Sequence, residues 1–194
     1  TGERTKKITI SEPGNYWLEV SYERNGCASY AFITITEDIE KPVITVTGND
    51  ELTCETTSIM LDASGSTVQG TATYSWSDGS EELGTGATLE VTTAGEYSVT
   101  VTDSDNGCSA TTSVIVTEDV TAVVATITGN EELTCETMSI TLDASSSTVQ
   151  GTASYLWSTG ETTATIDVTV PGDYDVTVTD SDNGCSTTSE VFTV

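Results

Sequence analysis

Apolar and polar residues alternate with a period of two along most of the chain. Between 97 and 102, Tyr97, Val99 and Val101 alternate with serine and threonine, and 174–179 repeats the pattern. Such alternation, in segments rich in Thr, Val and Ile, is typical of short strands with one buried face. No segment shows a helical period, so the chain is predicted to be all-β.

Gly, Asn and Asp interrupt the predicted strands roughly every ten residues. Asn106-Gly107 and Asn183-Gly184 predict tight hairpins in which both residues take a positive φ. About seven short strands in some 80 residues are typical of a Greek-key, immunoglobulin-like β-sandwich.

The sequence also repeats itself. Residues 44–77 recur at 125–158, and the back half of this unit occurs once more near the start of the chain, around Tyr16 and Cys27. We therefore expect three units in an extended rod cut from a longer protein. They are the C-terminal half of a truncated repeat at 1–39 (the partial repeat), a second repeat at 40–119 and a third repeat at 120–194.

Two pairs of aromatic residues are predicted to be structural. Trp76 and Trp157 lie on the third strand of their repeats, on the face expected to form the core. Tyr97 and Tyr174 follow Gly-Glu or Gly-Asp at the start of the penultimate strand, which is the position of a tyrosine corner.

The charge of the chain excludes several functions. The formal net charge is −26, there is no His, and residues 42–194 contain no Lys or Arg. Nucleic acids and anionic membranes bind clustered cations, and no apolar run is long enough to span a bilayer. We expect neither nucleic-acid binding nor membrane insertion.

Five short motifs together resemble a known repeat type. They are Leu-Thr-Cys (52–54, 133–135), Leu-Asp-Ala-Ser (61–64, 142–145), Tyr-x-Trp-Ser (74–77, 155–158), Gly-x-Tyr-x-Val-Thr-Val-Thr-Asp (95–103, 172–180) and Asn-Gly-Cys (106–108, 183–185). The set resembles the immunoglobulin-like, PKD-related repeats of giant secreted surface proteins of Bacteroidota, including gliding adhesins. The resemblance implies an extracellular stalk or adhesin exported by type IX secretion.

The five cysteines occupy matched repeat positions and predict disulfides formed in an oxidising compartment. The simplest closed set pairs Cys54 with Cys108 and Cys135 with Cys185, and this is the pairing we expect. The partner of Cys27 would lie outside the fragment. The alternative is a bond between successive repeats, Cys54–Cys185, because Leu-Thr-Cys falls near the far end of one sandwich and Asn-Gly-Cys near the facing end of the next.

Acidic residues on linkers and turns suggest Ca²⁺ sites between repeats, because hard carboxylate oxygens suit that ion. The alternative is a set of solvated turns. The two candidate groups are Glu118, Asp119, Asp143, Asp180 and Asp182, and Glu37, Asp38, Asp62, Asp103 and Asp105. Apart from this possible Ca²⁺ we expect no cofactor.

An enzyme is not expected. Paired carboxylates can hydrolyse glycosides, but here they recur on turns and linkers, with no loop long enough to enclose a cleft. Ser and Cys have no neighbouring base.

The partial repeat alone predicts outward aromatic residues, Trp17, Tyr30 and Phe32. They form a candidate binding patch, unless the strand register is shifted or a missing half-domain covers them.

Two functions follow. The first is a stiff, acidic, disulfide-closed extracellular stalk or filament, whose partners are neighbouring repeats of the same chain. The alternative is a carbohydrate- or protein-binding immunoglobulin-like module accessory to a secreted enzyme. Self-assembly is a further use of the aromatic patch.

Overall fold

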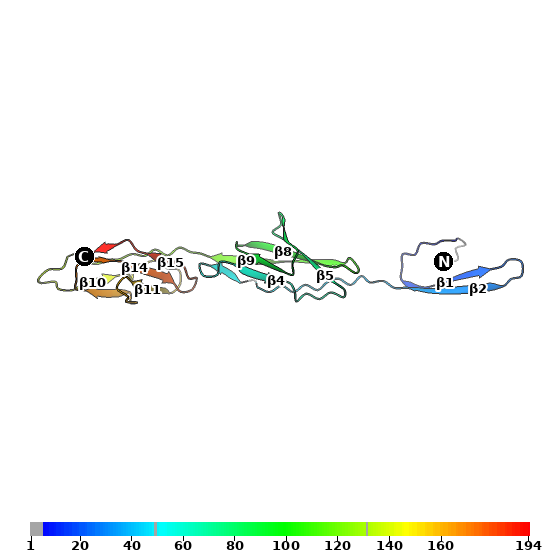
Figure 1. The fold of residues 1–194 in the computed structure, drawn as a ribbon, viewed down its shortest axis with the longest axis horizontal. Coiled ribbons are helices and arrows are strands. Elements are labelled where there is room, and N and C mark those ends of the chain that lie inside the picture. Colours follow the sequence, from blue (N-terminus) through cyan, green and yellow to red (C-terminus); the bar gives the residue numbers. More distant parts are fainter. Residues whose placement is uncertain (1–5, 49, 131) are drawn as a thin grey trace.

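The computed structural model describes residues 6–48, 50–130 and 132–194 as an extended row of three β units. The partial repeat lies at one end of the row and the third repeat at the other (Figure 1). No α-helix occurs in these ranges, and hence none that could cross a membrane. The predicted all-β fold is confirmed.

The second repeat is a two-layer sandwich. A five-stranded sheet in the order β3-β9-β8-β5-β6 forms one layer and the β4–β7 pair forms the other. The strand β3 runs parallel to the end of β9, while the other neighbours are antiparallel. The strands are β3 (Glu51–Thr53), β4 (Ile59–Asp62), β5 (Ala72–Ser77), β6 (Glu82–Gly84), β7 (Thr88–Val91), β8 (Gly95–Asp103) and β9 (Ser109–Asp119).

The third repeat has the same plan with shorter strands. One layer contains β11-β14-β15 and the β13–β16 pair, and the other contains β10–β12. The strands are β10 (Ile140–Asp143), β11 (Ala153–Trp157), β12 (Thr165–Val168), β13 (Asp173–Tyr174), β14 (Val176–Asp180), β15 (Ser186–Thr188) and β16 (Phe192–Thr193).

The partial repeat consists of one antiparallel hairpin, β1 (Gly14–Ser21) and β2 (Ala28–Ile35). Both of its faces are exposed. Leu18, Val20 and Ile33 lie on the face that corresponds to the core side of β8 and β9.

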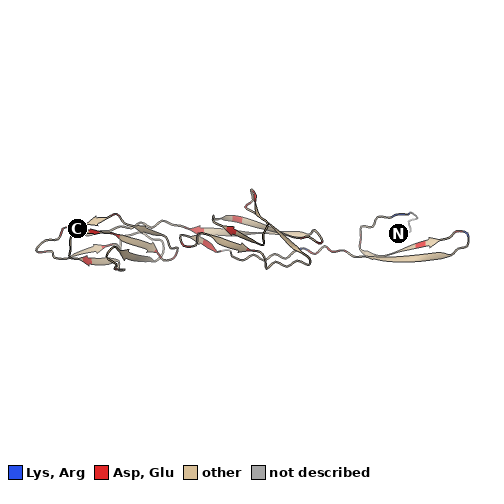
Figure 2. Ribbon diagram, viewed as in Figure 1, with Lys and Arg blue, Asp and Glu red and all other residues tan. Residues whose placement is uncertain are grey.

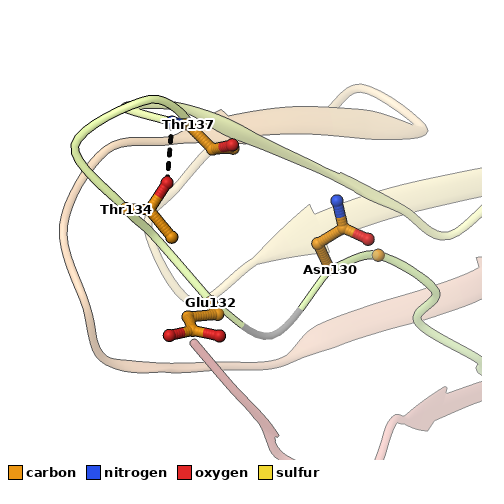
Figure 3. Close-up of a pocket in the computed structure, with 5 residues that line it drawn as sticks. Asn130, Glu132, Thr134 and Thr137 are labelled. Carbon is orange, nitrogen blue, oxygen red and sulfur yellow. Dashed lines mark hydrogen bonds between the residues drawn. The ribbon is translucent and has the colours of Figure 1, made fainter.

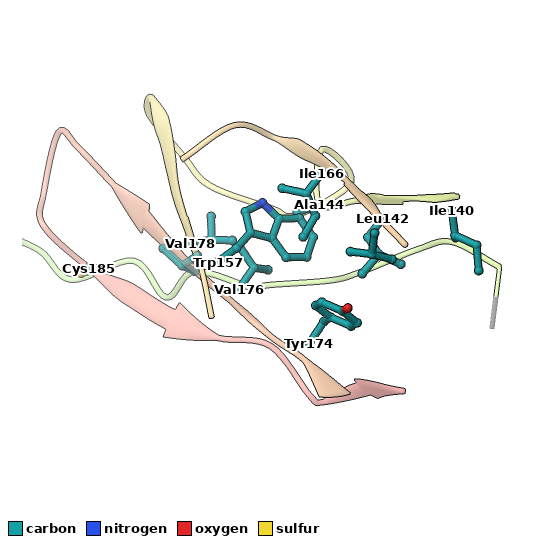
Figure 4. Packing of buried hydrophobic residues seen from close by; sticks show 11 residues of the cluster. Ile140, Leu142, Ala144, Trp157, Ile166, Tyr174, Val176, Val178 and Cys185 are labelled. Atoms are coloured by element: carbon teal, nitrogen blue, oxygen red, sulfur yellow. The ribbon is translucent and has the colours of Figure 1, made fainter. Parts of the chain in front are cut away.

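Each whole repeat has its own hydrophobic core. Trp76 is 0% exposed and Trp157 is 2% exposed, so their predicted core position is confirmed. Each indole N–H donates to a backbone carbonyl, that of Gly86 in the second repeat and that of Thr163 in the third. Figure 4 shows Trp157 packed among Leu142, Val176 and other apolar side chains. No residue belongs to both clusters, which indicates two separately packed units.

The predicted tyrosine corners are also confirmed. Tyr97 is buried, and its hydroxyl donates to the carbonyl of Thr93 over 2.8 Å. Tyr174 makes the same bond to the carbonyl of Val170 over 2.7 Å. Tyr16 of the partial repeat does so as well, with Glu12.

The Asn-Gly turns differ from the expectation. In the described ranges no residue other than glycine has a positive φ, and Gly107 and Gly184 each have a φ of 74°. The strands close instead around four-residue loops, because Asp103 N–H donates to the carbonyl of Cys108 and Asp180 N–H to that of Cys185. The asparagine then needs no left-handed conformation, and its side chain is free to accept a bond from the cysteine N–H.

Because the two cores are separate, we predict that Trp157→Ala destabilises the third repeat alone, by about 3–5 kcal/mol. Scanning calorimetry under reducing conditions should show one transition lowered and the other unchanged. Trp76→Ala is the matched control and should lower the other transition. Equal shifts of both transitions in either variant would contradict the separation of the cores.

Candidate functional site: the junction between the second and third repeats

One disulfide crosses between the whole repeats. Cys54 of the second repeat is bonded to Cys185 of the third, with their Cα atoms 5.0 Å apart and a sequence separation of 131. The expected bonds within repeats, Cys54–Cys108 and Cys135–Cys185, are therefore wrong, and the alternative pairing is the observed one.

The length of β8 explains why the bonds within repeats do not form. Cys54 follows β3, and β3 pairs with the C-terminal end of β9, which lies near the start of β8 at Gly95. Cys108 instead lies beside the opposite end of β8, at Asp103. Nine residues of strand separate these two ends by about 27 Å. Bonded cysteines need Cα atoms within about 7 Å.

Cys54 sits in a tight turn at the C-terminal end of the second repeat. Thr53 N–H donates to the carbonyl of Thr56, and the Thr53 hydroxyl accepts from the N–H groups of Glu55 and Thr56. We call residues 52–56, and the matching residues 133–137, the staple turn. Its bonds are local, so the turn presents the sulfur without help from the neighbouring repeat.

Cys185 follows a hairpin at the facing end of the third repeat, and Asn183 is its central residue. The Asn183 side chain accepts from Cys185 N–H and donates to the carboxylate of Asp119, while its backbone carbonyl accepts from Cys54 N–H over 3.1 Å. Asn183 thus contacts the hairpin, the linker and the staple turn at once, and it is only 3% exposed. Sequence reasoning assigned Asn183 only to a turn and missed this role.

The two repeats also touch beside the disulfide. A Cβ added at Gly184 would collide with the side chain of Glu55, which would have to move to make room for it. Gly184 also has the left-handed φ that glycine tolerates best. In the motif Asn-Gly-Cys, the Asn183 amide therefore bridges the two repeats, Gly184 lets Glu55 approach the backbone closely, and Cys185 supplies the sulfur.

A buried carboxylate holds the hairpin in place. Asp180 is 1% exposed and accepts the N–H groups of Asp182, Gly151 and Gln150. These bonds, led by that from Asp182, hold the pKa of Asp180 below its ordinary value of 3.8, although burial and the charge of Asp119 act in the opposite direction. Asp103 has the same place in the second repeat, and its pKa is lowered in the same way by Asp105 and Gly70 N–H groups.

The junction between the partial repeat and the second repeat has the same polar contact between a hairpin asparagine and a linker acid. Asn106 donates to the carboxylate of Asp38 over 2.9 Å and to the carbonyl of Glu40 over 3.1 Å. The linker acid and the hairpin asparagine therefore meet at both junctions. The candidate Ca²⁺ groups joined linker acids with hairpin acids, and linker and hairpin do meet at both junctions, but the partner of the linker acid here is an asparagine.

The ten acids proposed as Ca²⁺ ligands do not gather in two groups. Asp119 comes near Asp180, and its pKa is lowered chiefly by its bond from the Asn183 amide. Asp62 and Asp143 instead cap the local backbone at Ser64 and Ser145. Within the described ranges no three acidic or cysteine side chains are grouped as a metal ion would require. Figure 2 shows the acids spread along the whole row.

Three further cysteines are thiols in the described part of the chain. Cys27 and Cys135 are exposed and Cys108 is half-buried. Cys27 and Cys108 occupy the position of Cys185 in their hairpins, whereas Cys135 occupies the position of Cys54.

The three predicted outward aromatic residues lie on one exposed face of the β1–β2 hairpin. Trp17 pairs directly with Phe32, and the rings of Trp17 and Tyr30 are 6.0 Å apart. Phe32 is 80% exposed. The matching positions of the second repeat are Ser98, Thr111 and Ser113, so this surface belongs to the partial repeat alone.

No protein-family model matches the chain, and no curated protein matches it. Among solved structures it is similar to three N-terminal domains of the highly immunogenic outer capsid protein of bacteriophage RB49, with 23% identity, 77% of this chain and 57% of that chain covered, and a TM-score of 0.41. It is also similar to fibronectin(III)-like modules of Clostridium thermocellum CbhA, at 16% identity, 78% and 92% coverage, and a TM-score of 0.35.

A third similar structure is dimeric latent PorU from Porphyromonas gingivalis, at 15% identity, with 97% of this chain and 24% of that chain covered and a TM-score of 0.28. Similarities this weak carry no argument about function. The whole repeats are immunoglobulin-like sandwiches on the grounds of their own sheets and cores.

We predict that Asp180→Asn lowers the melting temperature of the third repeat at pH 7. The folded state favours the ionised carboxylate, so its contribution is present above the unfolded pKa of about 3.9 and is lost as the pH falls through the lower folded pKa. The gap between wild type and variant should therefore narrow below about pH 3.9 in melting curves recorded across pH. Asp103→Asn is the matched control and should act on the second repeat. A difference in melting temperature between wild type and variant that stays constant down to pH 2 would contradict a stabilising role for the ionised Asp180 carboxylate.

Proposed function

We propose that the chain is a segment of an extracellular stalk that carries tension, in which a disulfide links each immunoglobulin-like repeat to the next. The observation that supports this best is the Cys54–Cys185 bond between two separately packed repeats. A bond placed between units adds little to the core of either, but it restrains how they move relative to each other.

The bond also changes how tension passes along the chain. When the ends are pulled apart, the force passes from Cys54 directly to Cys185, and the residues between them form a closed loop. That loop contains β4 to β14, which include most of both cores. Unfolding either core would therefore add no length between Cys54 and Cys185 while the disulfide is intact.

The acidic surface suits the same role. With a net charge of −26 and no cation after Lys41, like charges repel along the row and favour an extended arrangement. The repulsion also keeps separate stalks from associating non-specifically.

The motif resemblance suggests where such a stalk belongs. We propose a secreted or cell-surface adhesin of the Bacteroidota type, related to PKD repeats and exported by type IX secretion, in an oxidising extracellular setting. In this role the chain is not an enzyme, and its main partners are neighbouring repeats, as a stalk or a filament.

The aromatic face of the partial repeat favours a second function. Trp17, Tyr30 and Phe32 form an exposed patch that neither whole repeat has. Exposed rings of this kind bind the apolar faces of sugars or protein partners. The partial repeat would then be a binding module at one point of the stalk.

We predict that reducing the disulfide lengthens the stretched chain by about 450 Å, because 131 residues at about 3.3–3.6 Å each are released. Single-molecule stretching from the two ends, with and without reductant, measures this length. Cys54→Ser should extend by the full length in both conditions. Equal extension of the oxidised and reduced wild type would contradict the stalk mechanism.

For the second function, we predict that Trp17→Ala lowers glycan or peptide binding by at least about tenfold, because truncating an aromatic anchor of a binding surface typically costs about 2 kcal/mol or more. Glycan-array screening followed by calorimetric titration measures it. Ser98→Ala, at the matching position of the second repeat, is the control and should bind as wild type does. Absence of any ligand for the wild type, or binding unchanged in Trp17→Ala, would reject this function.

A further inference from the structure

The third repeat carries a second, complete staple turn that has no partner cysteine in the described structure. Thr134 N–H donates to the carbonyl of Thr137, and the Thr134 hydroxyl accepts from the N–H groups of Glu136 and Thr137. These are the bonds that hold the staple turn of Cys54. Cys135 therefore stands, as an exposed thiol, in the geometry in which Cys54 is already bonded.

Beside this turn lies an open hollow of about 500 Å³, lined by Gly129, Asn130, Glu132, Thr134 and Thr137 (Figure 3). The matching surface of the second repeat is occupied. There Glu51 and Thr53 pair with the end of β9, and the hydroxyl of Thr117 donates to the carboxylate of Glu51. The hollow thus corresponds to the place where a linker passes from one repeat to the next.

The other half of the bond is repeated as well. The hairpin of Cys108 has the same carbonyl bonds as that of Cys185, the same asparagine-to-cysteine bond and the same bond from asparagine to a linker acid. The hairpin therefore takes this shape in the second repeat without a disulfide, since Cys108 is a thiol. Both halves of the junction therefore have the same shape with a free cysteine as with a bonded one.

We propose that Cys135 is a second stapling site, which forms a disulfide with the Asn-Gly-Cys cysteine of a further repeat of this type, whose linker lies in the hollow. The inference rests on the proposed stalk function and names the partner of its next junction. By the same rule, Cys108 bonds the Leu-Thr-Cys cysteine of a repeat on its other side.

The bond forms by thiol–disulfide exchange with a small disulfide such as oxidised glutathione. The Cys135 thiolate attacks one glutathione sulfur and releases one glutathione thiolate, giving a mixed disulfide. The partner cysteine thiolate then attacks the Sγ of Cys135 and releases the second glutathione. Two cysteine thiols are oxidised, one glutathione disulfide is reduced to two thiols, and the two protons pass to the released glutathione.

Such staples would interleave along the chain. The staple from Cys54 closes over Cys135, and a staple from Cys135 would start inside that loop and end beyond it. Cys135 follows Cys108 by only 27 positions. When Cys108 and Cys135 are both bonded to neighbouring repeats, the shortest covalent path across two repeats runs through these 27 residues. Without the disulfides it would run through about 160 residues, so the length that tension can draw out falls roughly sixfold.

The test appends a copy of residues 117–194 directly after Val194, so that the full chain is followed by one further repeat. This join follows the structure, because the backbone of Gly172 hydrogen-bonds to that of Val194 just as Gly95 pairs with Val116. Val194 therefore corresponds to Val116, and the next residue to Thr117. The protein is folded in a glutathione redox buffer, its free thiols are alkylated, and peptides are mapped without reduction.

We expect two linked pairs, Cys54 with Cys185, and Cys135 with the Cys185 counterpart of the appended repeat, leaving three alkylated cysteines. In Cys135→Ser, the counterpart should become alkylated while Cys54–Cys185 persists. If Cys135 is alkylated, or linked to a second molecule, while Cys54–Cys185 forms, this inference is overturned and the proposed function stands. If Cys54–Cys185 is also absent, both fail.

Discussion

The geometry of the junction depends on a disulfide that can close only when two separate repeats meet end to end. Its Cα atoms lie 5.0 Å apart, and each sulfur is carried by a turn whose own hydrogen bonds fix its shape. Because both turns stand at the ends of packed sandwiches, the bond restrains whole units rather than loose segments. The orientation of one repeat on the next therefore follows from local turn chemistry together with two rigid cores.

The acidity of the chain shapes what the junction can contain. Residues 42–194 contain no Lys or Arg, so the acids of this segment have no cationic side chain within it to pair with. Asparagine amides and backbone N–H groups take that place, as at Asp119 and Asp180. Such neutral donors satisfy a carboxylate without requiring a second charge to be desolvated. The lowered pKa of each aspartate follows from these donors.

The fold could be predicted largely from the sequence because it depends on local periodicity and on internal repetition. Alternation placed Trp76, Trp157 and both corner tyrosines correctly. The disulfide pairing and the Asn-Gly turn were wrong for a common reason, since both depend on where strand ends lie in space. Spacing alone does not report that Cys54 and Cys108 lie at opposite ends of β8, nor that Asn183 contacts three segments. The exact boundaries of the repeats and the binding role of Trp17 stay predictions.

The position of the two cysteines in each repeat has a consequence for repeat number. A pair within one sandwich would make every unit complete alone, and adding units would change nothing in its covalent structure. Here each whole repeat has one cysteine beyond each end of β8, a strand about 27 Å long, so under the proposed scheme a unit completes its bonds only with neighbours on both sides. In such an array, the unit at each end would carry one unused thiol. A design of this kind favours long arrays, because the fraction of unused thiols falls as repeats are added.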